Sequence, residues 1–328
     1  MHGIDSEHAH LPLDSRVRIA SAFTACTVAL IASPVWGHGF VGQRFFPATL
    51  AVDDPFVADE LALPTFTRRK MPASSEAPAN MQTDWAVDYA KRITADFGIG
   101  IGATYRRIAP EGGDTRRGFD NFALSAKYQV WKSEAHEAIV SVGVDWDVGG
   151  TGAKRIGAES FSTFTPSIFF GKGFGDLPDT AKFLRPVAVT GSIGVGLPTR
   201  TSTRSISDEG DEVMEHHPNV LQWGFTLQYS IPYLQSSVAD VGWREPFNRL
   251  VPVLEFAMAS PLNRGGGGTT GTVNPGLIWA GRYMQFGIEA VIPINGRSGH
   301  HTGILAQLHF YLDDIFPRSL GKPLVSLR

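Results

Sequence analysis

Several informative residue types are scarce in this chain. Its single cysteine, Cys26, gives no basis for a disulfide scaffold or for a zinc site built from several thiolates. Lysine and arginine number 29 against 32 aspartates and glutamates, and the net charge of −3 gives no sign of a nucleic-acid partner. Charged residues are 19% and aromatic residues 11% of the chain, which excludes a disordered protein. The longest apolar run, Ile19–Ala32, has 14 residues and is too short for a membrane-spanning helix.

This apolar run predicts a signal peptide for export. Arg16 and Arg18 precede it, and residues 33–37 have the composition of a cleavage region. We expect cleavage after Gly37, which defines residues 1–37 as the signal peptide and removes Cys26 with it. The mature chain is then expected to lack a cysteine nucleophile.

Strict alternation of apolar and polar residues dominates from Trp85 onward. In the clearest segment every second residue is large and apolar: Leu221, Trp223, Phe225, Leu227, Tyr229 and Ile231. The residues between them are Gln222, Gly224, Thr226, Gln228 and Ser230. A period of two places apolar and polar side chains on opposite faces of a β-strand. The sequence therefore predicts an all-β fold.

Alternation alone leaves two folds open: a soluble all-β fold with its apolar face inside, and a membrane barrel with that face toward lipid. Most alternating runs exceed the average soluble strand of about 5 or 6 residues and match the roughly 9 to 11 residues of a membrane strand. The polar face is rich in Gly, Ser, Thr and Gln, which is typical of a wet lumen. These features favour a single antiparallel transmembrane β-barrel. Because lipid cannot hydrogen-bond a free strand edge, the sheet must close on itself.

About twelve strands are expected, an even number, as in single-chain bacterial barrels. Long connections alternate with short ones, and this parity also favours twelve. Pro64, Pro252 and Pro275 fall inside three strands, and since proline cannot donate to a ladder, ten or fourteen strands stay open. The expected strands are 61–69, 84–93, 97–107, 119–131, 136–148, 161–171, 183–197, 220–231, 249–259, 273–280, 283–293 and 302–312.

The segment before the barrel, residues 38–60, has two interpretations. It is either a periplasmic tail or a plug in the barrel mouth. Asp54-Pro55 has the form of a helix N-cap followed by proline at the first helical position, which predicts a short helix over 55–62.

The remaining boundaries follow from the strands. The barrel is expected over 61–312 and a C-terminal tail over 313–328. The connection 232–248 is long on the side where the other turns are short. The spacing of its apolar residues predicts a short helix there.

Two parts of the sequence carry a resemblance to known proteins: the stretch Gly39–Pro47 and the repeated strands from Trp85 to Leu312. They resemble bacterial outer-membrane β-barrels and, more narrowly, the channel group named for the phenol meta-cleavage pathway. The resemblance implies a Gram-negative outer membrane, contact with the lipid bilayer and insertion by the outer-membrane assembly machinery. Members of the class usually end on an aromatic residue that this machinery reads. Here the last residues are Val325–Arg328, so Phe310 or Leu312 is the expected equivalent.

Several charged and amide side chains fall on the polar face of the predicted strands. A charge facing lipid costs about 2–4 kcal/mol at the bilayer midplane, so we expect these side chains in the lumen. Two roles stay open: ion pairs between strands that fill the lumen, and a ring that selects among solutes. The predicted lumen-lining residues are Asp88, Arg92, Lys127, Asp145, Asp147, Gln222, Gln228, Glu255, Glu289 and His309.

No pattern predicts a catalytic residue, a metal site or a cofactor. The acidic run 208–215 and the pairs His216-His217 and His300-His301 are typical of solvated loops. Gly265–Gly268 lacks the lysine and the helix of a phosphate-binding loop.

Barrels of about eight strands are filled by side chains and those of about sixteen are open, so twelve strands suit a narrow pore. The sequence therefore predicts a non-enzymatic outer-membrane channel for passive passage of an unidentified small solute. The alternatives are a structural or adhesive barrel with a plugged lumen, and a lipid-modifying enzyme.

Overall fold

The computed structural model describes residues 39–73, 78–206 and 212–325. The predicted signal peptide, residues 1–37, lies outside the described residues, and so do residues 208–211 of the acidic run. Within the described ranges, no helix combines the length and hydrophobicity needed to cross a bilayer.

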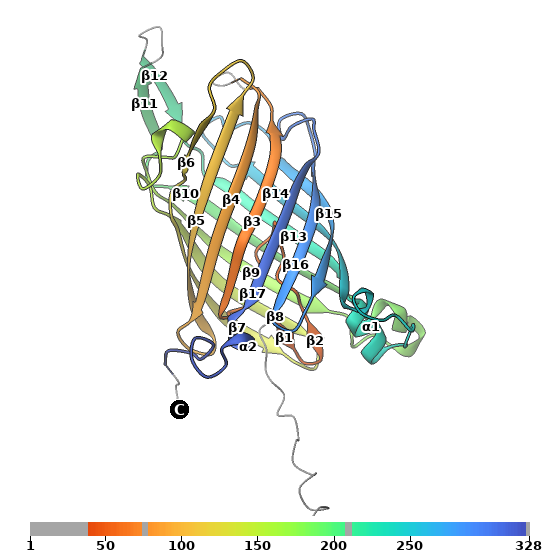
Figure 1. The fold of residues 1–328 in the computed structure, drawn as a ribbon. Coiled ribbons are helices and arrows are strands. Elements are labelled where there is room, and N and C mark those ends of the chain that lie inside the picture. The colour runs from red at the N-terminus through yellow and green to blue at the C-terminus, as the bar shows by residue number, and fades with distance from the viewer. Residues whose placement is uncertain (1–38, 74–77, 207–211, 326–328) are drawn as a thin grey trace, which may run out of the picture. The chain divides into compact units, whose positions relative to one another are not determined.

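Twelve long strands form one antiparallel sheet that closes on itself (Figure 1). Strands that follow one another in sequence pair with one another, and β17 pairs with β3 to complete the closure. The prediction of a twelve-stranded antiparallel barrel is confirmed. The strands are β3 (Glu60–Met71), β4 (Asn80–Arg92), β5 (Phe97–Pro110), β7 (Ala123–Ser133), β8 (Ala138–Asp147), β9 (Thr163–Gly173), β10 (Val187–Pro198), β13 (Val220–Tyr229), β14 (Leu250–Pro261), β15 (Thr270–Ala280), β16 (Met284–Pro293) and β17 (Gly303–Tyr311).

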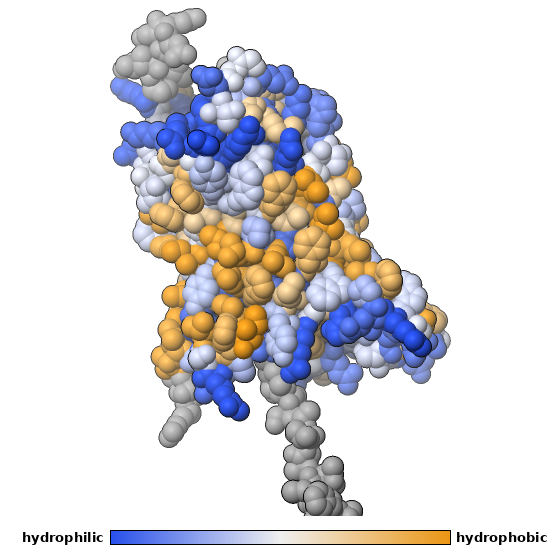
Figure 2. Space-filling model, viewed as in Figure 1, coloured by the Kyte–Doolittle hydropathy of each residue, from blue (hydrophilic) through white to orange (hydrophobic). Residues whose placement is uncertain are grey.

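Alternation along each strand separates a lumenal face from an outer face. On β13, Thr226 and Gln228 are 0% and 2% exposed, whereas Leu227 between them is 43% exposed. Large apolar side chains are exposed in the same way on most other strands, among them Ile193 and Ile288. Figure 2 shows the result as a hydrophobic band across the middle of the visible face, with hydrophilic residues above it.

The three expected strands that contain Pro64, Pro252 or Pro275 all form. The register of β3 against β4 shifts between Ala62 and Thr65, which places Pro64 in an irregularity of the ladder. At such a point the sheet loses few hydrogen bonds to a residue that lacks a backbone N–H group. Pro252 and Pro275 lie within β14 and β15, and both strands continue on either side of them.

The two ends of the barrel carry different connections. We call the end at the top of Figure 1 the loop end and the opposite end the turn end. The loop end carries β6 (Arg116–Phe119), η1 (Lys154–Ile156) and the hairpin of β11 (Ser202–Ile206) with β12 (Glu212–His216). The turn end has short turns and two longer connections, which hold η2 (Asp179–Leu184), α1 (Ile231–Ser237) and η3 (Phe247–Arg249). The helix predicted within 232–248 forms as α1 but ends at Ser237.

The chain after β17 folds back onto the turn end. It begins with α2 (Leu312–Ile315) and continues to the turn between β4 and β5. There the backbone N–H groups of Leu324 and Val325 donate to the carbonyls of Arg92 and Ile93, at 3.2 and 2.8 Å.

Residues 39–59, here called the lumenal segment, lie inside the barrel. A small hairpin of β1 (Phe40–Val41) and β2 (Arg44–Phe45) begins the segment at the turn end (Figure 1). The following residues run toward mid-barrel, turn at 50–53 and return to the start of β3.

The lumenal segment contains no helix, so the helix predicted over 55–62 is wrong. The local signal behind that prediction is nevertheless present, because Asp54 Oδ1 accepts the N–H of Phe56 at 2.9 Å. The backbone groups that follow form hydrogen bonds with side chains of the barrel wall. Gln129 accepts the N–H of Val57 at 3.0 Å, and these lumenal partners keep the segment extended.

Candidate functional site

A glutamate of β14 holds the apex of the lumenal segment. The carboxylate of Glu255 accepts the backbone N–H groups of residues 50–52, at nitrogen–oxygen distances of 2.8, 2.9 and 2.7 Å. Gln285 of β16 adds two bonds to Ala48, accepting its N–H at 3.2 Å and donating to its carbonyl at 2.6 Å. Hydrogen bonds to a charged acceptor are stronger than those between neutral groups. The apex is therefore fixed to the wall formed by β14–β16.

From the apex the lumenal segment crosses to β7 and β8, nearly half the sheet away. The Lys127 ammonium of β7 donates to Asp53 Oδ1 at 2.9 Å and to the carbonyl of Asp54 at 2.6 Å. The hydroxyl of Ser141 on β8 donates to the carbonyl of Pro55. Burial raises the pKa of the Asp54 carboxyl to about 7, and the charge of Lys127 opposes part of that rise.

A fully buried guanidinium anchors the lumenal segment at the turn end. Arg44 Nε lies 3.1 Å from Glu137 Oε2, and the guanidinium carbon lies 3.8 Å from the centre of the Tyr233 ring of α1. Tyr233 donates its hydroxyl hydrogen to Glu137 at 3.0 Å. Burial raises the pKa of Tyr233, and its hydrogen bond to Glu137 raises it further. Removing one partner of a buried ion pair costs about 3–5 kcal/mol, so this cluster holds the hairpin firmly.

Asp59, also fully buried, anchors the other end of the segment. Its carboxylate lies 2.6 Å from Lys91 Nζ and 2.8 Å from Arg92 Nε. Lys91 in turn donates to the carbonyls of Leu320 and Lys322, at 2.8 and 2.7 Å. The exit of the lumenal segment, strand β4 and the C-terminal residues are thus joined by one set of polar contacts.

Glycines of the lumen wall fall into two groups. In the first, a Cβ atom would lie less than 3 Å from a side chain of the lumenal segment. These contacts pair Gly98 with Val57, Gly224 with Val52 and Gly287 with Leu50, at 2.9, 2.8 and 2.6 Å. In the second group, Gly100, Gly102 and Gly194, a Cβ atom would meet only atoms of the wall. Missing side chains therefore make room for the segment at the first positions and widen the lumen at the second.

The lumenal segment divides the lumen into two chambers. The inner chamber, toward the turn end, has a volume of about 410 Å³, and the outer chamber, toward the loop end, has about 540 Å³. Residues 51–53 of the apex line both chambers, and so does Asp145 of β8. These volumes are in the range of small-molecule sites.

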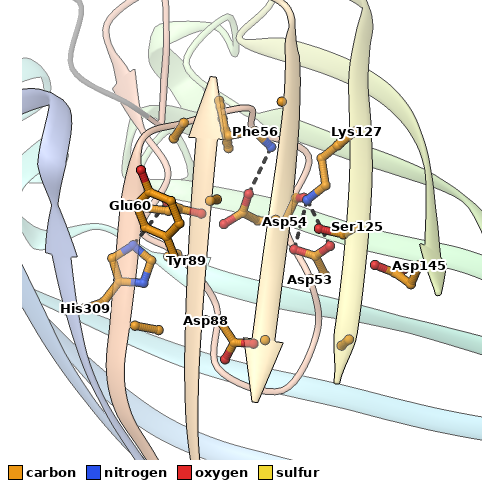
Figure 3. A pocket seen from close by; sticks show the side chains of 18 of the residues that line it. Asp53, Asp54, Phe56, Glu60, Asp88, Tyr89, Ser125, Lys127, Asp145 and His309 are labelled. Atoms are coloured by element: carbon orange, nitrogen blue, oxygen red, sulfur yellow. Dashed lines mark hydrogen bonds and ion pairs between the residues drawn. The ribbon is translucent and has the colours of Figure 1, made fainter. Parts of the chain in front are cut away.

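The inner chamber is acidic (Figure 3). Two of its carboxylates are paired, Asp53 with Lys127 and Glu60 with His309, the latter at 3.1 Å. Asp88 and Asp145 have no hydrogen-bond or ion-pair partner among the described residues, and their side chains point into the chamber.

The outer chamber carries positive charge instead. Arg69 of β3 and Arg297 of the connection between β16 and β17 both line it. The rest of its lining is mainly hydroxyl, amide and glycine groups, such as Ser167, Ser192 and Gln222.

The predicted lumen residues have several different surroundings. Asp88, Lys127, Asp145 and His309 meet in the inner chamber, and Gln222 lines the outer chamber. Glu255 and Arg92 bind the lumenal segment. Gln228 and Glu289 are buried against the wall, bonded to Thr190 at 3.3 Å and to Asn274 at 3.2 Å. Asp147 is exposed at the last residue of β8.

Several residues of this site escaped the sequence analysis. Arg44, Asp53 and Asp59 lie outside the strands, where alternation carries no signal. Arg297 lies in a loop. Arg69 could have been predicted from the alternation, because it falls on the lumenal face of the strand expected over 61–69. In the part of the chain that the structure describes, no three His, Cys, Asp or Glu side chains group closely enough to hold a metal ion.

Comparisons by sequence found no relatives. No protein-family model matches the chain, and no curated protein matches it.

Solved structures do match the fold. An outer-membrane channel of Pseudomonas putida F1 is 11% identical, with 81% of this chain and 99% of that chain covered and a TM-score of 0.53. The β-domain of the Bordetella autotransporter BrkA is 14% identical, with coverages of 77% and 99% and a TM-score of 0.48. The NanC porin is 8% identical, with coverages of 75% and 97% and a TM-score of 0.42. The chain is therefore similar in fold to the Pseudomonas barrel, over most of both chains.

Proposed function

We propose that this protein is an outer-membrane channel for the passive passage of small polar solutes. The observation that carries the proposal is the divided lumen. Two chambers of about 410 and 540 Å³ meet at the apex of the lumenal segment, and each is lined by some charged groups that form no ion pair within the described ranges. A barrel that served only as a scaffold would gain stability from pairing these charges or replacing them with packed apolar side chains.

The proposed location in the outer membrane follows from the outer surface of the barrel. A closed barrel with an apolar outer band requires a bilayer, and bacterial barrels of this kind lie in the outer membrane. We propose that residues 1–37 direct export and that the assembly machinery inserts the barrel. The likeness in fold to the Pseudomonas outer-membrane channel supports this assignment, and membership of the channel group named for the phenol meta-cleavage pathway is part of the proposal.

In this proposal the lumenal segment is the constriction of the pore. Contacts at Arg44, Glu255 and Asp59 hold it at its beginning, apex and end. Solutes then pass beside a segment that stays in place. The width of the passage is set by the apex and by glycines such as Gly194, which leave part of the outer chamber's wall without side chains.

Conductance of the purified barrel in planar bilayers tests the proposal, and a cross-link tests the role of the segment. A Cβ atom at Gly287 would lie 3.2 Å from Cγ of Leu50, the position that a cysteine Sγ would take, so cysteines at these two positions are placed for a disulfide. We expect unitary current steps in the native chain, and nearly the same steps with the disulfide formed. Reduction of the same sample is the internal control.

Two results would contradict this account in different ways. Current that appears only after reduction would mean that the segment leaves the lumen during passage. No current in either state would favour the second candidate, a structural barrel whose lumen is plugged. The three anchors of the lumenal segment are the observation that favours that candidate.

A further inference from the structure

The two arginines of the outer chamber form no ion pair in the part of the chain that the structure describes. Neither the Arg69 nor the Arg297 guanidinium has a hydrogen bond or ion pair among the described residues, and Arg69 Nε is buried without a partner. The carboxylate on the strand next to Arg69, Asp84 of β4, is occupied by Arg106 at 3.0 Å. Guanidinium groups present a planar fork of donors that matches a carboxylate. The outer chamber therefore offers donors to an anionic group that the protein itself does not supply.

The boundary with the inner chamber carries the opposite charge. Asp145 lines both chambers and forms no hydrogen bond or ion pair with any residue that the structure describes, while Asp53, which also lines both, is paired with Lys127 at 2.9 Å. One side of the outer chamber thus has two free cations, and its inner boundary has one free carboxylate. Charges of this kind form charge-assisted hydrogen bonds with a ligand of complementary charge.

We propose that the outer chamber binds a small zwitterionic solute, with the solute's carboxylate at Arg69 and Arg297 and its ammonium group at Asp145. The proposal deepens the channel function above and rests on it for its purpose, since the bound solute would be the one that passes. A purely anionic solute would meet the carboxylates of the inner chamber next, and a purely cationic solute would first meet the arginines. A molecule that carries both charges is attracted at both steps.

Equilibrium binding to the purified barrel tests the proposal without requiring conductance. The probes are 4-aminobutyrate and 6-aminohexanoate, with butyrate and butylamine as the single-charge controls of matched size. We expect at least one of the two zwitterions to bind about tenfold more tightly than either control, as two charge-assisted contacts predict. Equal binding of butyrate and the zwitterions would overturn the assignment to Asp145, and no binding of either zwitterion would overturn the site.

Single substitutions test which residues contact the bound zwitterion. Arg69→Gln and Arg297→Gln should each weaken zwitterion binding about tenfold, and Asp145→Asn should reduce it to the level of butyrate. Arg69→Lys keeps the charge and should retain part of the affinity, which separates loss of the site from loss of the fold. Arg68→Gln is the matched control, because Arg68 is exposed on the outer face of the same strand. Unchanged binding in the Arg69, Arg297 and Asp145 variants would overturn the proposal.

Conductance of the same samples separates this proposal from the channel function. Current without zwitterion binding leaves the channel standing and removes the site. Binding without current retains the site as a ligand-binding chamber and removes the channel.

Discussion

Glu255 Oε2 lies 2.7 Å from the backbone nitrogen of Val52, which joins the middle of a barrel strand to a residue 203 positions earlier in the chain. The same carboxylate accepts the two preceding N–H groups, so one side chain satisfies three consecutive donors. An extended segment in a lumen has no partner strand of its own, and its N–H groups need acceptors. The position of the apex therefore depends strongly on this one residue.

Replacing Glu255 should loosen the constriction. Glu255→Gln keeps one acceptor oxygen but removes the charge and the second acceptor, a loss of about 1.5–3 kcal/mol for charged hydrogen bonds. We expect larger or more frequent current fluctuations in single-channel recordings. Asp147→Asn is the control, because it also removes a carboxylate, and Asp147 is exposed at the last residue of β8, away from the lumenal segment. Identical recordings for the two variants would contradict the role of Glu255.

Added side-chain volume should have opposite effects on conductance at two kinds of lumenal position. One kind lies against the apex of the lumenal segment, and the other faces the open outer chamber. Gly287→Leu places a side chain where Leu50 now lies, 2.6 Å from the glycine's would-be Cβ, and should displace the apex and raise conductance. Gln222→Trp adds volume in the outer chamber and should lower conductance. The measurement is unitary conductance in one salt. A decrease for both variants would show that the segment cannot move aside.

An arginine placed on the outer face of the barrel should lower the free energy of unfolding more than an arginine on the lumenal face. Ile193 is 47% exposed on the lipid side of β10, and Ser192 next to it lines the outer chamber. Ile193→Arg should lower the free energy of unfolding in bilayers by about 2–4 kcal/mol, whereas Ser192→Arg should change it by roughly 1 kcal/mol or less. Urea titration of the barrel in lipid vesicles measures both. Equal losses would mean that the faces of β10 were assigned wrongly.

The ion selectivity of the barrel should depend on pH through the ionisation of the Asp54 carboxyl group. Burial raises the pKa of Asp54 to about 7, so its carboxyl is largely protonated in mild acid and ionised in mild base. The inner chamber therefore gains a negative charge between about pH 5.5 and about pH 8.5. We expect preference for cations over anions, measured from reversal potentials, to rise over this range. Asp54→Asn should reduce the change, and an undiminished change would assign it to another group.

The sequence by itself determined the class of fold and the sides of its strands. Alternation is a local property, because successive side chains on a strand point to opposite faces whatever the strand pairs with. Runs such as Leu221–Tyr229 therefore identified strands, lipid-facing positions and lumenal positions together. Prolines lowered the expected regularity of three strands, and at Pro64 the ladder accommodates the missing donor through an irregularity that no single-strand pattern contains.

The tertiary structure alone decided the path of the lumenal segment and the grouping of the charges. The capping hydrogen bond of Asp54 forms as its local sequence predicts, yet no helix follows, because Gln129 and Ser141 take the next backbone groups. Arg44 and Glu137 are 93 residues apart, and Arg44 lies outside every alternating run, so no local pattern could pair the two. Side chains so distant in sequence meet only after the sheet has closed, when burial removes water as a partner and leaves the opposite charge as the stable alternative.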